Sequence, residues 1–182
     1  MDTINSVLNV SRIEGGHVQI ELKPIDLKVE MDELIALHAP CAQKQRLYID
    51  YNHNAPNTPF IVDHNGFNQI FQSLLDKALK FTHLGGVTFR SFQIKKDDQD
   101  YIVISVKDTG IGMDENFMEN ALDPSKHESE GHKRAYEGSE LGLSLVRKWT
   151  HLLHGQIELR NTRNHGTKFL VHIPRLQLRH LR

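Results

Sequence analysis

A run rich in β-branched residues ends at an aspartate that two closely spaced glycines follow. Residues 101–107 hold four Ile and Val side chains, and Asp108, Gly110 and Gly112 come directly after them. Such a run predicts a strand, and glycines at its end let the backbone turn sharply and approach a flat or anionic ligand closely. A carboxylate at that point can accept hydrogen bonds from an amino group such as that of a purine. The simpler interpretation is a tight turn after a strand, and the surrounding sequence decides between the two.

Composition restricts the class of protein. The chain has 182 residues and a formal net charge of −1, which suits one domain with no general attraction for nucleic acid. We expect no direct membrane contact, because no apolar run approaches the roughly 18 residues of a membrane span and Met1 is followed by polar residues. Cys41 is the only cysteine and the 12 histidines are scattered, so we expect neither a disulfide nor a metal site.

Hydrophobic periodicity predicts interleaved helices and strands. Helices are predicted at residues 3–13, 27–46, 64–80 and 140–153. Strands are predicted at residues 17–22, 47–51, 87–94, 100–107, 156–161 and 167–173. Pro40 should bend or split the second helix, and the polar stretch 114–138 predicts a long loop of the kind that forms lids or is disordered. The order predicts an α+β fold, a two-layer sandwich with a mixed sheet and helices on one face.

Four segments together resemble the catalytic domain of sensor histidine kinases, which shares its ATP-binding fold with gyrase, Hsp90 and MutL. They are similar, in chain order, to the N-box helix, the G1 box, the second half of the G2 box and the closing Gly-Ser/Thr-x-Phe element. The four segments are residues 63–82, 108–113, 141–146 and 165–169. Their order and spacing match the family from about residue 4 to about residue 174. The resemblance implies a Bergerat-type ATP-binding fold.

The resemblance also implies how the chain is divided and what surrounds it. Residues 1–16 would be the C-terminal end of the dimerisation helix, residues 17–174 the ATP-binding catalytic-type domain, and residues 175–182 a basic tail that frays. The phosphoacceptor histidine would lie before residue 1, so this chain would not phosphorylate itself. The implied partners are the dimerisation and phosphoacceptor helices of the parent kinase and a response-regulator receiver domain. The implied location is the cytoplasm, with the parent protein anchored in the inner membrane.

The resemblance implies a nucleotide site as well. Asp108 would receive the adenine amino group above a floor shaped by the glycines of the turn, and Thr167 would reach the base through water. Lys80 would reach the phosphates, and the backbone amides of Gly138 and Gly142, at a helix start, would bind phosphate oxygens. Simpler interpretations stay open: Asp108 bonded to nearby amides, Thr167 as an ordinary strand residue, Lys80 as a solvated lysine. The predicted nucleotide-binding residues are Lys77, Lys80, Phe81, Asp108, Gly110, Gly112, Gly138, Leu141, Gly142 and Thr167.

Lys77 departs most sharply from the family, whose members carry there an asparagine that holds Mg²⁺ against the triphosphate. Mg²⁺ takes hard oxygen ligands, and an ammonium has no lone pair to offer and repels the ion. Three placements stay open for Lys77: extended into solvent, against the phosphates in place of the metal, or paired with a carboxylate such as Asp76. The expected cofactor is therefore ATP or ADP, with Lys77 arguing against Mg²⁺, and no metal ligand is predicted.

Other departures point the same way. Ser73 stands where kinases carry a second asparagine and gyrase-type ATPases carry a glutamate general base, which argues against hydrolysis by that route. Glu137 and Glu140 replace lid glycines, and a carboxylate beside a triphosphate is repelled. Leu122 and Ser125 replace the phenylalanines that anchor the lid in the family.

Three functions are consistent with these residues. The favoured one is the ATP-binding catalytic domain of a two-component sensor histidine kinase of the hybrid type, with impaired or altered Mg²⁺-dependent nucleotide use. The alternative is a pseudokinase-like domain that acts as a nucleotide sensor or a protein-interaction module without phosphoryl transfer. A gyrase-like ATPase ranks third, because Ser73 is not acidic.

Overall fold

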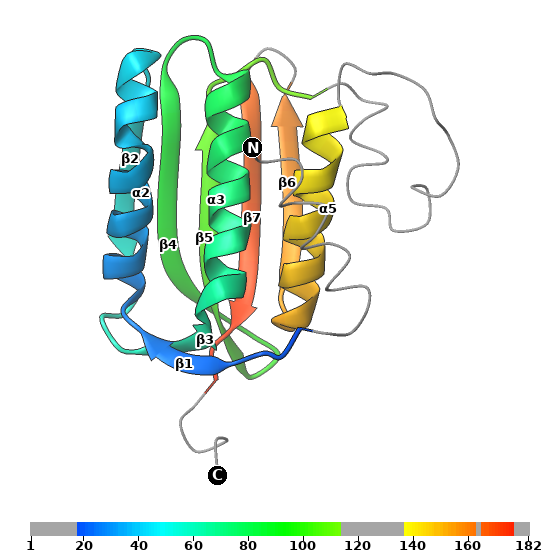
Figure 1. Ribbon diagram of the computed structural model, residues 1–182. Coiled ribbons are helices and arrows are strands. Elements are labelled where there is room, and N and C mark those ends of the chain that lie inside the picture. The colour runs from blue at the N-terminus through cyan, green and yellow to red at the C-terminus, as the bar shows by residue number, and fades with distance from the viewer. Residues whose placement is uncertain (1–17, 114–136, 163–164, 177–182) are drawn as a thin grey trace.

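Three helices cover one face of a five-stranded sheet (Figure 1). The computed structural model describes residues 18–113, 137–162 and 165–176. The elements are β1 (Leu22–Ile25), α2 (Leu27–Lys44), β2 (Tyr48–Asn54), β3 (Phe60–Asp63), α3 (His64–Phe81), β4 (Gly86–Lys96), β5 (Gln99–Asp108), α5 (Glu137–Leu152), β6 (Gln156–Thr162) and β7 (Gly166–Pro174).

The sheet is mixed, as the sequence predicts. Its strand order is β2-β4-β5-β7-β6, with β2 and β4 parallel and the other neighbours antiparallel. β1 and β3 form a separate antiparallel pair at one end of the helix layer (Figure 1). The predicted fold class, a two-layer α+β sandwich with helices on one face, is confirmed.

α3 begins at a side-chain cap. Asp63 caps the helix, because its Oδ1 accepts a hydrogen bond from the backbone N of Gly66 at 2.7 Å. Its Oδ2 accepts a second bond from the backbone N of Glu21 at 2.7 Å, which ties the chain before β1 to the same point. The apolar stripe that follows packs on the sheet and consists of Phe67, Ile70, Phe71, Leu74, Leu75, Ala78 and Leu79. With this stripe on the sheet, the last turn of α3 ends at Phe81, beside the turn that follows β5.

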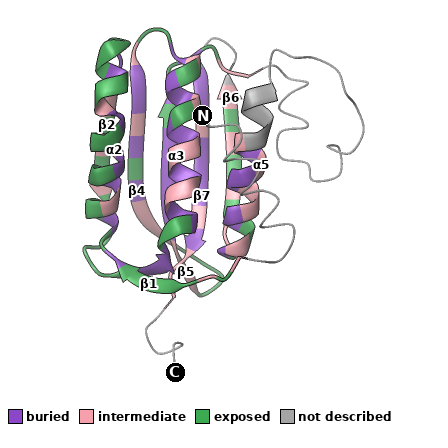
Figure 2. Cartoon of the chain, viewed as in Figure 1, coloured by how far each residue is buried: buried purple, intermediate pink, exposed green. Residues whose placement is uncertain are grey.

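The central strand β5 delivers Asp108 to the helix side of the sheet. Side chains alternate along a strand, so Asp108 faces the same way as Ile104 and Val106, which belong to the core. On the neighbouring β7, Thr167 shares that side with Phe169, which pairs with Val106. Buried residues run along β4 and β7 behind the helices (Figure 2). The alternation therefore places Asp108 and Thr167 together between sheet and helices.

Two strands differ from the prediction. The strand predicted at residues 17–22 starts only at Leu22, where the ladder with β3 begins. The apolar side chains of Val18 and Ile20, which suggested a strand, are half-buried against the core ahead of that ladder. β3 has no counterpart among the predicted strands, because four residues are too few to show a period.

Pro40 does not split α2, so that part of the prediction that it would bend or split the helix is wrong. The helix runs from Leu27 to Lys44 with Pro40 inside it. Proline removes the one hydrogen bond that its missing N–H would give to the carbonyl of Ala36. Both residues lie on the exposed side of the helix, where water can take that bond.

Hydrogen bonds attach the first residue after β7 to the sheet. The backbone N of Arg175 donates to the carbonyl of Asp100 at 2.8 Å, and its Nη1 donates to Oε1 of Gln93 at 2.8 Å. The predicted fraying of the tail therefore does not include Arg175. The helix predicted at residues 3–13, most of the loop predicted at residues 114–138, and the last residues of the tail lie outside the described residues.

A buried histidine joins α2 to α3 and should make stability depend on pH. His38 Nδ1 lies 2.8 Å from the carbonyl oxygen of Leu34 and Nε2 lies 3.1 Å from Oδ1 of Asp76. The bond to Asp76 raises the pKa of His38 above its ordinary value of 6.5, against the opposing effect of burial. Since the folded pKa is raised, the stabilisation is complete below the unfolded pKa and is lost as pH rises through the folded one.

We expect Asp76→Asn to lower the free energy of unfolding more at pH 5.5 than at pH 8.5. The difference between the two pH values should be about 0.5–1 kcal/mol, at the scale of screened pairs because the Asp76 side chain is 57% exposed. Urea titrations of both proteins at the two pH values measure it, with Glu33→Gln, an exposed acid on α2, as the control. A cost of Asp76→Asn that does not vary with pH would show that His38 is neutral throughout.

Candidate functional site

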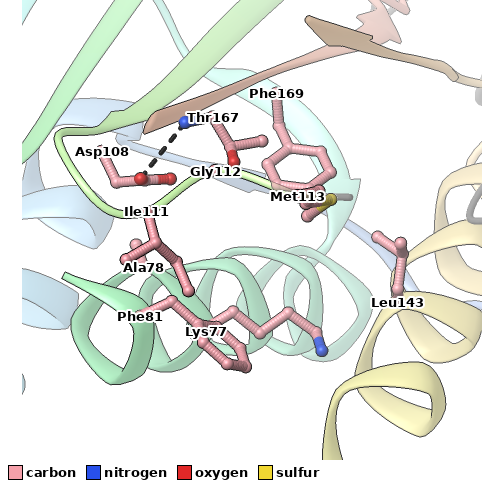
Figure 3. Close-up of a pocket in the computed structure, with 10 residues that line it drawn as sticks. All are labelled: Lys77, Ala78, Phe81, Asp108, Ile111, Gly112, Met113, Leu143, Thr167 and Phe169. Carbon is pink, nitrogen blue, oxygen red and sulfur yellow. Dashed lines mark hydrogen bonds between the residues drawn. The ribbon is translucent and has the colours of Figure 1, made fainter. Parts of the chain in front are cut away.

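A pocket lies where the last turn of α3, the turn after β5, the start of β7 and the side of α5 meet (Figure 3). Its space of about 570 Å³, part of it open to solvent, is within the range of small-molecule sites, about 300–1,000 Å³. The lining is mostly apolar, with a carboxylate, a hydroxyl and an ammonium among it. The lining residues are Lys77, Ala78, Phe81, Asp108, Ile111, Gly112, Met113, Leu143, Thr167 and Phe169.

Asp108 is the buried carboxylate of the pocket. It is 7% exposed, and its Oδ1 accepts hydrogen bonds from the backbone N of Gly110 at 2.8 Å and of Thr167 at 3.2 Å. Burial raises the pKa of Asp108, and the two amide donors oppose that rise. The simpler interpretation, a carboxylate bonded to nearby amides, therefore holds for Oδ1. These bonds do not use Oδ2, which leaves the carboxylate able to accept from a ligand as well.

The turn after β5 is in close backbone contact with the end of α3. The backbone N of Ile111 donates to the carbonyl oxygen of Phe81 at 3.2 Å. A side chain at Gly110 would begin 2.4 Å from the same oxygen, so only glycine permits this approach. Gly112 follows at φ 72° and lines the pocket. Gly110 thus permits the aspartate turn and the end of α3 to lie together, as the sequence predicts, and Gly112 shapes the turn beside them.

Lys77 crosses the pocket from α3 toward α5. A side chain at Gly142 would begin 2.9 Å from Cε of Lys77 and 3.3 Å from its Nζ, so the lysine lies over that glycine. Figure 3 shows the ammonium on the side of the pocket toward α5, away from Asp108 and Thr167. Asp76, one residue earlier, is directed to His38 on α2. Of the three placements left open for Lys77, this path disagrees with full extension into solvent, and it does not choose between contact with phosphates and pairing with a carboxylate.

The other predicted residues are placed differently from one another. Phe81 lines the pocket, while Lys80 is exposed, lies 5.4 Å from the centroid of the Phe81 ring and is not a lining residue. Gly138 and Leu141 belong to the first turns of α5, as does Gly142. The positions expected to anchor the lid, Leu122 and Ser125, lie outside the described residues.

Sequence reasoning missed most of the apolar wall. Ala78, Ile111, Met113, Leu143 and Phe169 all line the pocket. Phe169 could have been found, because it is two residues from Thr167 on a strand and so faces the same side. Met113 could have been found as the last residue of the aspartate turn.

Mg²⁺, which the resemblance implies, does not fit the side chains present. Among the lining residues, side-chain oxygens belong only to Asp108 and Thr167, and the family's asparagine position carries the ammonium of Lys77. No group of three or more His, Cys, Asp or Glu side chains in the described part of the chain could hold a metal ion.

No helix within residues 18–113 or 137–162 is long and apolar enough to cross a bilayer.

Comparison with known sequences identifies the family. Residues 62–177, more than half of the chain, match the family described as histidine kinase-, DNA gyrase B-, and HSP90-like ATPase. The chain is 29% identical over 174 residues to the autoinducer 2 sensor kinase/phosphatase LuxQ of Vibrio harveyi, covering 94% of this chain and 20% of that protein. It is 28% identical over 181 residues to the cell-division control histidine kinase PdhS of Brucella anthropi, covering 94% and 17%. The chain thus spans about a fifth of the length of these relatives.

Solved structures share the fold. Full-length ShkA in complex with AMPPNP superposes with a TM-score of 0.79 at 22% identity, over 96% of this chain and 35% of that one. The nucleotide-free catalytic domain of the histidine kinase ThkA superposes with a TM-score of 0.70 at 21% identity, over 85% and 98%. Sequence match and fold agree that the chain belongs to the histidine kinase-, DNA gyrase B- and HSP90-like ATPase family, as the catalytic ATPase domain of the sensor histidine kinase type.

Proposed function

We propose that the pocket binds the adenine nucleotide ATP or ADP, and that Lys77 neutralises the phosphates where other kinases use a Mg²⁺ ion. The observation that carries the proposal is the path of Lys77 across the pocket over Gly142. Binding then needs no divalent cation, and phosphoryl transfer by the usual metal-assisted route is impaired. The chain would be the nucleotide-binding part of a longer hybrid sensor kinase in the cytoplasm. It would act with the dimerisation helices and a receiver domain of that kinase.

The base end of the pocket suits a purine. Its wall is formed by Ala78, Ile111, Met113, Leu143 and Phe169, which offer the flat apolar contact that an aromatic base requires. Asp108 at the end of this wall is a buried acceptor, and burying it without a further donor is costly. An exocyclic amino group supplies that donor.

The phosphate end of the pocket suits an anion but not a metal-bound triphosphate. An ammonium attracts phosphate oxygens directly and repels a divalent cation at the same place. Metal ions do much of the charge neutralisation in phosphoryl transfer, and one lysine replaces only part of that charge. Ser73, one helical turn before Lys77, adds no carboxylate that could act as a general base. The arrangement therefore supports binding more than transfer.

The dependence on magnesium tests this proposal. Calorimetric titrations of the chain with ADP and ATP, in EDTA and in excess Mg²⁺, should give affinities that differ by less than about threefold. The reason is that Lys77 already supplies the positive charge that the metal would bring. Binding that disappears in EDTA would contradict the proposal and restore the ordinary kinase mode. No binding in either buffer would favour the alternative, a protein-interaction module that uses no nucleotide.

Replacing the lysine tests its role directly. Lys77→Asn should weaken ADP binding in EDTA by about 10-fold or more, the scale of a lost charge-assisted contact, and should make binding tighten when Mg²⁺ is added. Calorimetry in the same two buffers measures both effects. Lys107→Asn is the matched control, because Lys107 precedes Asp108 on β5 and by alternation faces the other side of the sheet. If Lys77→Asn binds ADP as the parent chain does in both buffers, Lys77 does not contact the phosphates.

A further inference from the structure

Asn161, near the end of β6, holds the backbone of Met113 with both ends of its side-chain amide. Its Oδ1 accepts a hydrogen bond from the N of Met113 at 2.7 Å, and its Nδ2 donates to the O of Met113 at 2.9 Å. A backbone N–H can only donate and a carbonyl can only accept, so these two bonds determine which end of the amide is oxygen. The edge strand thereby fixes one residue of the pocket wall.

The same oxygen also faces Thr167. Thr167 Oγ1 lies 3.4 Å from Oδ1 of Asn161. Because Oδ1 carries no hydrogen, the hydroxyl of Thr167 must donate in this contact. The bond is longer than the usual O–H···O distance of about 2.7–2.8 Å, so it biases the direction of the rotating hydroxyl toward Asn161. With its hydrogen directed to Asn161, the oxygen of Thr167 presents only lone pairs to the pocket that it lines.

The polar wall of the base end therefore offers acceptors alone. Asp108 accepts through a carboxylate, and Thr167 accepts through the lone pairs that Asn161 leaves free. Figure 3 shows these two side chains next to each other on one wall. A 6-aminopurine brings an amine with two N–H groups to such a wall. A 6-oxopurine brings a carbonyl oxygen, which both acceptors repel.

We propose that Asn161 is a positioning residue that sets the base selectivity of this pocket. It does not line the pocket itself. It acts through the backbone of Met113 and through the direction of the Thr167 hydroxyl, and it favours a 6-amino over a 6-oxo purine nucleotide. This inference rests on the proposed function, since it presupposes that a purine nucleotide occupies the pocket.

The test compares ADP with IDP, which differs from ADP in carrying a 6-oxo group. Calorimetry in EDTA gives the ratio of their dissociation constants for the parent chain, for Asn161→Leu and for the control Gln156→Leu, which removes an exposed amide from the start of the same strand. We expect the parent chain to prefer ADP and Asn161→Leu to narrow that preference by about 3- to 10-fold, the value of one neutral hydrogen bond. The control should keep the parent ratio. Should Asn161→Leu not fold, Asn161→Ala takes its place.

A double-variant cycle separates positioning from a merely structural role. Thr167→Val removes the hydroxyl, so adding Asn161→Leu to it should change the ADP-to-IDP ratio less than Asn161→Leu does in the parent chain. The change that remains is the part that acts through the backbone of Met113. Equal weakening of ADP and IDP by Asn161→Leu, with the ratio unchanged, would overturn the inference while leaving nucleotide binding intact. Absence of ADP binding to the parent chain would overturn the proposed function, and this inference with it.

Discussion

The structure depends on how a buried carboxylate is accommodated at the end of its central strand. A carboxylate away from water is costly unless donors meet it, and Asp108 receives two backbone amides, from Gly110 and Thr167. The second donor is available because β7 begins at Gly166, with φ 90°, where a side chain would begin 2.1 Å from the carbonyl oxygen of Asp108. The turn and the start of β7 therefore meet at Asp108, the end of α3 meets the same turn at Ile111, and the pocket lies beside these contacts.

The pocket is divided electrostatically along its length. At one end Asp108 and Thr167 offer oxygen acceptors, and at the other Lys77 offers an ammonium. A nucleotide has the complementary order, with amine hydrogens on its base and negative charge on its phosphates. The agreement of both ends with one ligand is stronger support than either end alone, since a buried acceptor or a half-buried lysine is common in proteins. In the proposed binding mode, Lys77 meets the phosphates where the family carries an oxygen ligand for a metal.

Local signals in the sequence account for most of what could be predicted. The periodic α3 and β5, and the glycines after Asp108, carry their structure within a few neighbouring residues. β3 is too short to show a period, and the solvent that tolerates Pro40 is not visible in a residue pattern. Asn161 and Met113 lie 48 residues apart, and the side-chain amide of Asn161 meets backbone atoms of Met113, which any residue except proline would offer at position 113. Such a contact does not constrain the residue type at position 113, so the sequence alone does not reveal it.

The packing of α3 on α5 leaves room for the side chain of Lys77 along the pocket wall. The two helices approach at two glycines: Gly66 of α3, where a side chain would begin 2.5 Å from the ring of Trp149, and Gly142 of α5, over which Lys77 lies. The first contact closes one end of the helix pair and the second closes the other. A side chain larger than hydrogen at position 142 would displace Lys77 from the wall. The path of Lys77 along the pocket wall is therefore permitted by the glycine at position 142, while Trp149 packs in the core.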